Sequence, residues 1–159
     1  MPLFAGVWYA DWSKQPLPTA SDAHRGLVLL PSTLDQLCRS AAGCPVTWEH
    51  SAVSTIQNAD PGKEREAAIN HSCTVGKVKA SWIERSTGYA RVVFEIFDTC
   101  PMVCALINSK ALTSLSATHI VGGVEMVELS LTNTPARPGC NIDGGVSSIT
   151  DYIAIHPPL

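Results

Sequence analysis

Short segments in which apolar residues alternate with polar ones recur along the whole chain, and this feature limits the fold more than any other. Alternation with a period of two is typical of half-buried strands. We expect strands over residues 3–9, 26–31, 45–50, 73–83, 88–97, 111–118 and 122–132, and one more in the final residues. Many short strands with few helices favour a mainly β protein, an antiparallel barrel or sandwich. The 159 residues are enough for one domain over residues 1–159 with its own core.

Two short helices are expected among these strands. In the first, over residues 32–39, Ser32 is the predicted N-cap and Asp35 follows three residues later, as in a capping box. The second is expected over residues 98–107. Loops and turns rich in polar residues, glycine or proline are expected at 51–70, 121–123 and 134–139.

Charge and hydropathy exclude several classes of function. The formal net charge is −3, and basic residues nowhere cluster beyond a pair, so we expect no nucleic-acid partner. No apolar run approaches the ~20 residues that a membrane-spanning helix needs, so we expect no membrane partner. The N-terminus lacks the basic and apolar regions of a secretory signal, which predicts an intracellular protein.

The cysteines favour the same compartment. Their spacing along the chain is irregular, and several lie inside apolar runs as small hydrophobic residues do. Cys100 and Cys104 do not have the usual zinc spacing and have no second pair nearby. We therefore expect reduced thiols and no metal site.

A hydrolytic site needs a nucleophile, a base and a group that orients the base. His50 ends an alternating strand before a long polar loop, from which a histidine can point into a cleft. His71, which precedes residues 72–76 and could equally start a strand, is the competing base. Ser114 and Ser116 alternate along one strand, so both hydroxyls face the same side. A histidine at a strand end is more often an exposed residue, and a serine pair in a strand is more often ordinary, so the residues alone leave both roles open.

Glu128 is a carboxylate inside an otherwise apolar strand. If that strand is buried, the carboxylate needs a histidine or another donor beside it to remain charged. Glu95 and Asp98 are weaker candidates for the same role. His119 follows Ser114 closely, but five residues along an unbroken strand place it on the opposite face.

The order of these segments resembles assemblin, the capsid maturation protease of herpesviruses. The resemblance runs from about residue 3 to 142, and its segments are residues 3–10 (LFAGVWYA), 29–31 (LLP), 45–50 (PVTWEH), 74–78 (TVGKV) and 113–116 (TSLS). It implies a single-domain antiparallel β-barrel of the herpesvirus-protease type. It also implies Ser114 as nucleophile and His50 as general base, with Ser116 and His71 as the alternatives.

Glu128 takes the position at which that family has a second histidine. In this respect residues 128–136 (ELSLTNTPA) resemble the prohead proteases of tailed phages. The resemblance therefore implies Glu128 as the third member of the triad, with His119 as the alternative. It places the oxyanion-binding loop at Ala136 and Arg137.

The function implied by the resemblance is that of a serine endopeptidase that cleaves scaffold protein during viral capsid assembly and maturation. The scaffolding protein is then the peptide substrate, the enzyme forms a homodimer, and no cofactor or metal takes part. The implied location is the host nucleus or the interior of the procapsid. The alternative is a non-catalytic β-barrel that serves as a binding or scaffold module.

Overall fold

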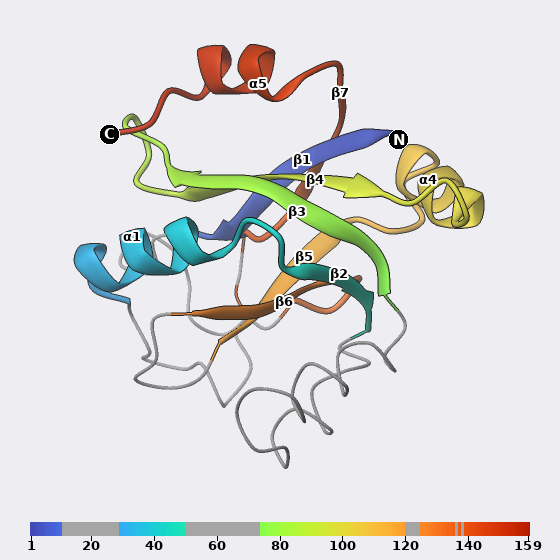
Figure 1. Cartoon of the computed structure of the whole chain (residues 1–159), viewed down its shortest axis with the longest axis horizontal. Coiled ribbons are helices and arrows are strands. Elements are labelled where there is room, and N and C mark those ends of the chain that lie inside the picture. Colours follow the sequence, from blue (N-terminus) through green and yellow to red (C-terminus); the bar gives the residue numbers. More distant parts are fainter. Residues whose placement is uncertain (11–28, 50–73, 120–124, 136, 138) are drawn as a thin grey trace.

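A computed structural model describes residues 1–10, 29–49, 74–119, 125–135, 137 and 139–159. The chain is mainly β, with three short helices in the described part (Figure 1). The elements in chain order are β1 (Leu3–Tyr9), α1 (Pro31–Ser40), β2 (Pro45–Trp48), β3 (Thr74–Ile83), β4 (Ala90–Ile96), α4 (Pro101–Asn108), β5 (Ser114–His119), β6 (Met126–Thr132), β7 (Ile142–Val146) and α5 (Ile149–Ile155).

The strands form one curled sheet in the order β5-β6-β2-β3-β4-β1-β7. Neighbouring strands in the described part run antiparallel, except that β2 and β6 run parallel, with Thr47 opposite Ser130. The expectation of an antiparallel barrel is therefore wrong in two respects, because the sheet is open and it is mixed. The broader expectation of a mainly β fold with a few short helices is confirmed.

The two edges of the open sheet meet at one point. Ser114, the first residue of β5, forms a single antiparallel bridge with Asn141, which directly precedes β7. The Asn141 carbonyl also accepts a hydrogen bond from the Val7 amide at 2.9 Å. A Cβ atom on Gly6 would lie 2.4 Å from the Asn141 carbonyl oxygen, so this approach requires glycine. The glycine of β1 thus fixes the backbone beside Ser114.

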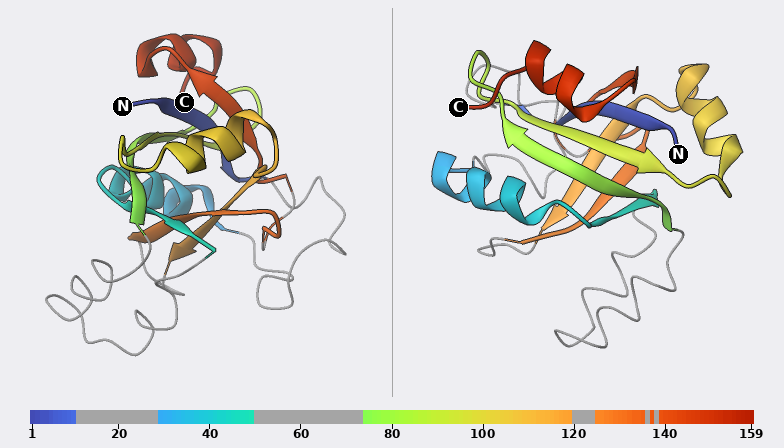
Figure 2. Two further views of the ribbon diagram at one scale, coloured as in Figure 1. Left: turned by 90° about the vertical axis from the view of Figure 1, so that its right-hand side faces the viewer. Right: turned by 45° about the horizontal axis from the view of Figure 1, so that its top comes forward.

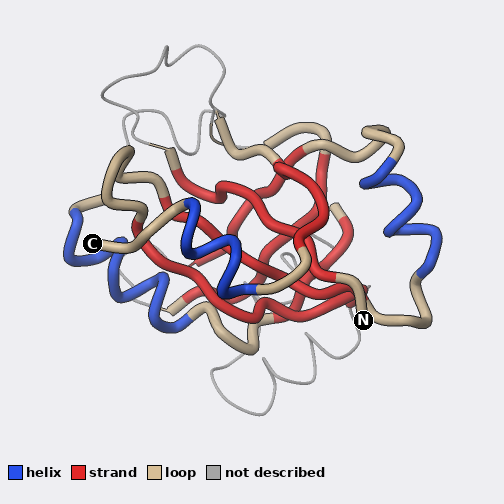
Figure 3. Tube along the Cα trace, turned by 90° about the horizontal axis from the view of Figure 1, so that it is seen from above, coloured by secondary structure: helices blue, strands red, loops and turns tan. Residues whose placement is uncertain are grey.

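The middle of the sheet is covered on both faces, and β1 carries apolar residues on both sides. Phe4 and Phe94 stack in the main core together with residues of α1. Val93 faces the other way, where it packs with Trp82 and with Tyr152 of α5. Helices α1 and α5 therefore lie on opposite sides of these strands (Figure 2), and α5 lies over the strands when they are viewed from above (Figure 3).

The start of α1 differs from the expectation. Leu30 is the N-cap, Pro31 is the first helical residue, and no side chain caps the helix. Ser32 is therefore not the cap, and Asp35 instead accepts a hydrogen bond from Arg39 at 2.8 Å. The strand expected over residues 26–31 is also wrong for its last three residues, while residues 26–28 lie outside the described part.

The C-terminal residues contain more structure than the one strand expected. Strand β7 is followed by α5, whose N-cap is Ser148. The Ser148 hydroxyl accepts a hydrogen bond from the Asp151 amide at 3.1 Å, which satisfies one of the helix's terminal donors. The expected loop at 51–70 and the expected turn at 121–123 lie outside the described residues.

The thiols of the described part behave as small hydrophobic groups. None of the described cysteines forms a disulfide; they are Cys38, Cys44, Cys100, Cys104 and Cys140. Burial raises the pKa of the Cys38 and Cys44 thiols to about 11, so both are protonated near neutral pH. No described helix has the length and apolar character that crossing a membrane requires.

Candidate active site

Three adjacent strands carry hydroxyl and carboxyl side chains on one face and apolar side chains on the other. On the apolar face, Val46, Leu115, Leu129 and Leu131 belong to the main core. We call the opposite face the polar face; its members are Thr47, Ser114, Ser116, Thr118, Glu128, Ser130 and Thr132. Across β5 and β6, Ser114 faces Thr132, Ser116 faces Ser130, and Thr118 faces Glu128. Apart from Thr118, every member of the polar face is buried.

Glu128 is the fully buried carboxylate of the polar face, with 0% of its surface exposed. Its Oε2 atom accepts a hydrogen bond from the Thr47 hydroxyl at 2.6 Å. Its Oε1 atom accepts one from the Thr118 hydroxyl at 3.2 Å. A buried carboxylate is stable only with such donors, so the sequence-based expectation of a partner for Glu128 is met by residues that the sequence analysis did not single out.

Ser114 begins β5 on the same face as Glu128. Its hydroxyl lies 3.1 Å from the Thr113 hydroxyl, and the Asn133 side chain holds the Thr113 amide at 2.9 Å. Ser114 and Glu128 lie in facing pairs that are four residues apart along β5, which corresponds to about 13 Å along a strand. A third side chain must therefore lie between them if they are to act together.

Ser116, the alternative nucleophile, lies in the middle of the polar face opposite Ser130. His119, the alternative third member, ends β5 beside a register irregularity and is paired with Met126. The extra residue at this irregularity is Val127, which belongs to β6, so the alternation along β5 is unbroken. His119 thus lies on the face opposite Ser114.

The backbone just before His50 is placed at the level of Ser114. The Glu49 amide donates to the Leu131 carbonyl at 3.1 Å, and the Glu49 carboxylate accepts a hydrogen bond from Thr132, the residue that faces Ser114. Glu49 has a positive φ of 49°, which is uncommon for a residue other than glycine. The candidate bases His50 and His71 lie outside the described residues.

The segment after β6 returns to the same place. The Thr132 hydroxyl accepts a hydrogen bond from the Thr134 amide at 3.0 Å, and the Leu115 amide donates to the Cys140 carbonyl at 2.8 Å. Both ends of the expected oxyanion loop are therefore fixed beside Ser114. Ala136 lies outside the described residues.

Arg137 lies within this loop and is buried. Its guanidinium carbon lies 4.9 Å from the centre of the Tyr9 ring of β1, a cation–π contact. Burial lowers the pKa of Arg137, but an arginine at this depth remains charged near neutral pH. The loop therefore carries a fixed positive charge.

A groove of about 330 Å³ adjoins the start of β5. Leu112 and Ile142 contribute apolar surface to it. Two neighbours of Ser114 also line it: Thr113, which precedes Ser114 in the sequence, and Asn141, which is its partner in the bridge. An open groove beside a serine that begins an edge strand is a place where an extended chain can bind.

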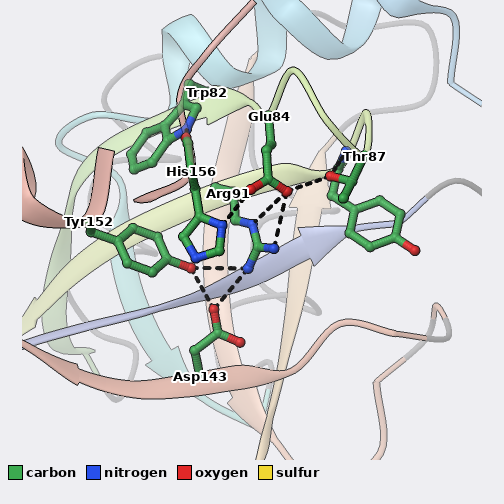
Figure 4. Close-up of polar contacts among 8 residues, drawn as sticks. Trp82, Glu84, Thr87, Arg91, Asp143, Tyr152 and His156 are labelled. Carbon is green, nitrogen blue, oxygen red and sulfur yellow. Dashed lines mark hydrogen bonds and ion pairs between the residues drawn. The ribbon is translucent and has the colours of Figure 1, made fainter. Parts of the chain in front are cut away.

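A second polar cluster, which is partly buried and which the sequence analysis missed, holds α5 against the sheet (Figure 4). We call it the Glu84 cluster; its members are Trp82, Glu84, Thr87, Arg91, Asp143, Tyr152 and His156. Arg91 contacts Glu84 at 3.1 Å and Asp143 at 2.9 Å. His156 Nδ1 is paired with the other oxygen of Glu84, and the His156 carbonyl accepts from the Trp82 indole at 2.7 Å.

Burial and hydrogen bonds shift the pKa values of Glu84 and Tyr152 in the Glu84 cluster. Burial acts to raise the pKa of Glu84, but hydrogen bonds from Thr87, His156 and Arg91 together outweigh it and lower that pKa. Burial raises the pKa of Tyr152, as does its hydrogen bond to Asp143. The bonds of the cluster connect the end of β3 with β4, β7 and α5.

The chain is similar in structure to a viral protease. The crystal structure of KSHV protease in complex with a hexapeptide phosphonate inhibitor matches 89% of this chain and 64% of that chain, with a TM-score of 0.53 and 16% sequence identity. The chain thus spans less than two thirds of that protease's length. At this identity the likeness shows the fold. No family model matches the chain, and the search of curated proteins found no match.

Proposed function

We propose that the chain is a serine endopeptidase in which Ser114 is the nucleophile, His50 the general base and Glu128 the carboxylate that orients the base. The observation that carries this proposal is the polar face, on which the buried Glu128 and Ser114 lie on the same side of two paired strands. The separation of these residues along β5 leaves room for one imidazole ring. The fold shared with a viral protease supports the same conclusion.

The placement of Glu49 supports His50 as that imidazole. Glu49 is bonded to Leu131 and Thr132, so the chain reaches residue 50 from the level of Ser114. Backbone conformations with positive φ at ordinary residues cost free energy and are often found at functional sites. A left-handed residue directly before the proposed base fits such a site.

In the proposed reaction, the Ser114 hydroxyl attacks a peptide carbonyl while His50 takes its proton. His50 then returns the proton to the leaving amine, and water releases the acyl group from Ser114 in a second round of the same steps. Glu128 accepts a hydrogen bond from the other imidazole nitrogen and stabilises the imidazolium. Backbone amides at Ala136 and Arg137 bind the oxyanion, a contribution of about 3 kcal/mol for each donor.

The proposed substrate is a scaffolding protein, cleaved in an extended conformation during viral capsid assembly and maturation. Strand β5 lies at one edge of the sheet. Its first residues are hydrogen-bonded to residues 140–142, and an extended peptide can add to the edge beyond them by main-chain hydrogen bonds. We also propose that the enzyme acts as a homodimer. Specific activity should then rise with protein concentration, and a constant value over a dilution series would contradict this part of the proposal.

One observation favours the second candidate, a non-catalytic binding or scaffold module. Ser114 is buried, and its hydroxyl lies within hydrogen-bond distance of Thr113. A buried serine of this kind can have a structural role only, in which its hydroxyl forms a hydrogen bond with a neighbouring side chain. The two candidates differ in one property, since only an enzyme has a Ser114 that reacts with acylating reagents.

The experiment is labelling with a fluorophosphonate probe, followed by intact-mass measurement and mapping of the modified residue. We expect one label per chain, on Ser114. Ser114→Ala and His50→Ala should each remove it. Ser116→Ala is the matched control, because it removes a hydroxyl from the same face and should leave labelling intact, as should His71→Ala.

Labelling that is lost in Ser116→Ala but kept in Ser114→Ala would move the nucleophile by two residues. Labelling that depends on His71 instead of His50 would reassign the base. A folded wild-type protein that no probe labels, and that cleaves no scaffold peptide, would favour the non-catalytic module.

A further inference from the structure

We infer that Thr47 and Thr118 are positioning residues that hold the Glu128 carboxylate in the orientation that the catalytic histidine needs. This inference rests on the proposed function, because it gives Glu128 a partner in the reaction. It assigns a role to two threonines of the polar face that do not touch the reacting atoms.

The geometry places Glu128 between the two threonines. Glu128 belongs to β6, which lies between β5 and β2 in the sheet. Thr118 of β5 faces Glu128 directly and donates to Oε1 at 3.2 Å. Thr47 of β2 faces Ser130, which is two residues after Glu128 in β6. Its hydroxyl donates to Oε2 of Glu128 at 2.6 Å. Each carboxylate oxygen thus has its own donor, and the two donors come from opposite sides.

Two donors on opposite sides fix the plane of the carboxylate. A glutamate side chain has three rotatable bonds, so its carboxylate needs outside contacts to keep one direction. Threonine is suited to the task because its branched Cβ restricts its own rotation. Thr47 has 0% of its surface exposed, so its hydroxyl cannot readily be replaced by bulk water.

The same bonds affect the charge. Hydroxyl donors stabilise the carboxylate form of a buried glutamate without neutralising it. In a histidine–glutamate pair, hydroxyl donors stabilise the negative charge of the carboxylate. They therefore lower the affinity of the pair for a proton. Removing a threonine hydroxyl should therefore make the pair easier to protonate.

The experiment measures kcat/KM for cleavage of a scaffold-derived peptide over a range of pH, in the full chain. The variants Thr47→Val and Thr118→Val keep the shape of the side chain and remove the hydroxyl. Thr47→Ser and Thr118→Ser keep the hydroxyl. Thr87→Val is the matched control, since the Thr87 hydroxyl donates to Glu84 at 2.5 Å and so forms the same kind of bond to the other buried glutamate.

We expect each valine variant to lower kcat/KM about tenfold, the size that accompanies loss of one hydrogen bond to a charged group. The acid limb of the pH profile should move to higher pH. The serine variants should restore both the rate and the acid limb of the wild type. Thr87→Val should leave both unchanged, even if it lowers the melting temperature.

Folded valine variants with the wild-type rate and acid limb would overturn the inference while leaving Ser114 labelling, and so the proposed function, intact. An equal loss in the serine variants would also overturn it, since the hydroxyl is still present there. Thr118 is only half-buried, so Thr118→Val gives a decisive result even if Thr47→Val fails to fold. A wild-type protein with neither labelling nor cleavage would instead reject the proposed function.

Discussion

Glu84 and Glu128 are both buried glutamates of the same sheet, but the groups that hold them differ. Glu84 follows β3 and is met by the guanidinium of Arg91 and the imidazole of His156. Glu128 lies within β6, and the donors described for it are the hydroxyls of Thr47 and Thr118. The guanidinium of Arg91 thus gives Glu84 a charged partner, while two of the partners of Glu128 are hydroxyls.

The difference fits a structural role for Glu84 and the catalytic role that we propose for Glu128. A carboxylate paired with a guanidinium is largely neutralised, and its bonds connect the elements that carry the partners. Arg91 in this way joins Glu84 to Asp143 of β7, and α5 rests on the same network (Figure 4). Hydroxyl donors hold a carboxylate in place but leave its charge, which is the property needed to stabilise an imidazolium.

The strongest test exchanges each glutamate for glutamine. We expect Glu128→Gln to lower the cleavage rate about a hundredfold or more, because an amide cannot stabilise the charged imidazole. The protein should remain folded. Glu84→Gln should keep the cleavage rate of the folded protein within about twofold while lowering its stability. Rates are measured at a temperature where both variants are folded by circular dichroism.

The alternative third member provides the control for this comparison. His119→Ala should have little effect on cleavage, because His119 lies on the other face of β5 from Ser114. A rate that falls with His119→Ala and not with Glu128→Gln would assign the role to the histidine.

The next test breaks the charge pairing of the Glu84 cluster. Arg91→Met keeps most of the side-chain volume and leaves two carboxylates, Glu84 and Asp143, without their guanidinium. We expect the free energy of unfolding to fall by about 3 kcal/mol, as measured by urea denaturation. Arg39→Met is the matched control; it removes the exposed pair with Asp35 and should cost less than about 1 kcal/mol. Equal losses would mean that the buried network contributes no more than a surface pair.

The lowered pKa of Glu84 gives a smaller effect that depends on pH. Its ordinary pKa is 4.5, and in the folded chain the value is lower. The carboxylate therefore stabilises the fold above about pH 4.5, and this contribution is lost as the pH falls through the folded value. The difference in unfolding free energy between wild type and Glu84→Gln should shrink as the pH falls below about 4.5. A difference that grows below that pH would contradict the assigned direction.

The sequence was sufficient for most strands and for one feature of the candidate site, the need of Glu128 for a partner. The periodic apolar residues predict β1 through β6 because each strand has at least one face in the core, and a carboxylate in an apolar strand identifies Glu128 as a residue in need of a partner. Alternation does not say which strands are neighbours, so the parallel pairing of β2 with β6 was not predicted. Thr47 was missed for the same reason, since threonine is ordinary in strands and its bond to Glu128 spans 81 positions.

The Glu84 cluster was missed for a different reason. Its residues come from the end of β3, from β4, from β7 and from the C-terminus, and no local pattern connects them. Helix α5 has seven residues, too few for a helical period to be evident. The signal that was present is its cap, Ser148 followed three residues later by Asp151.

That cap allows the smallest of these tests. Ser148→Ala removes the hydroxyl that holds the Asp151 amide, so we expect a loss of about 1 kcal/mol in unfolding free energy. Ser32→Ala is the counterpart, because Ser32 is exposed inside α1, whose N-cap is Leu30; it should change stability by no more than about 0.5 kcal/mol. Amide exchange at Asp151 should quicken only in the Ser148 variant. Cleavage should be unchanged in both, since α5 packs against the outer face of β1 and β4 and does not reach Glu128. A slower Ser148→Ala enzyme would mean that the two buried glutamates are coupled through the sheet, and that the separation between a structural and a catalytic carboxylate does not hold.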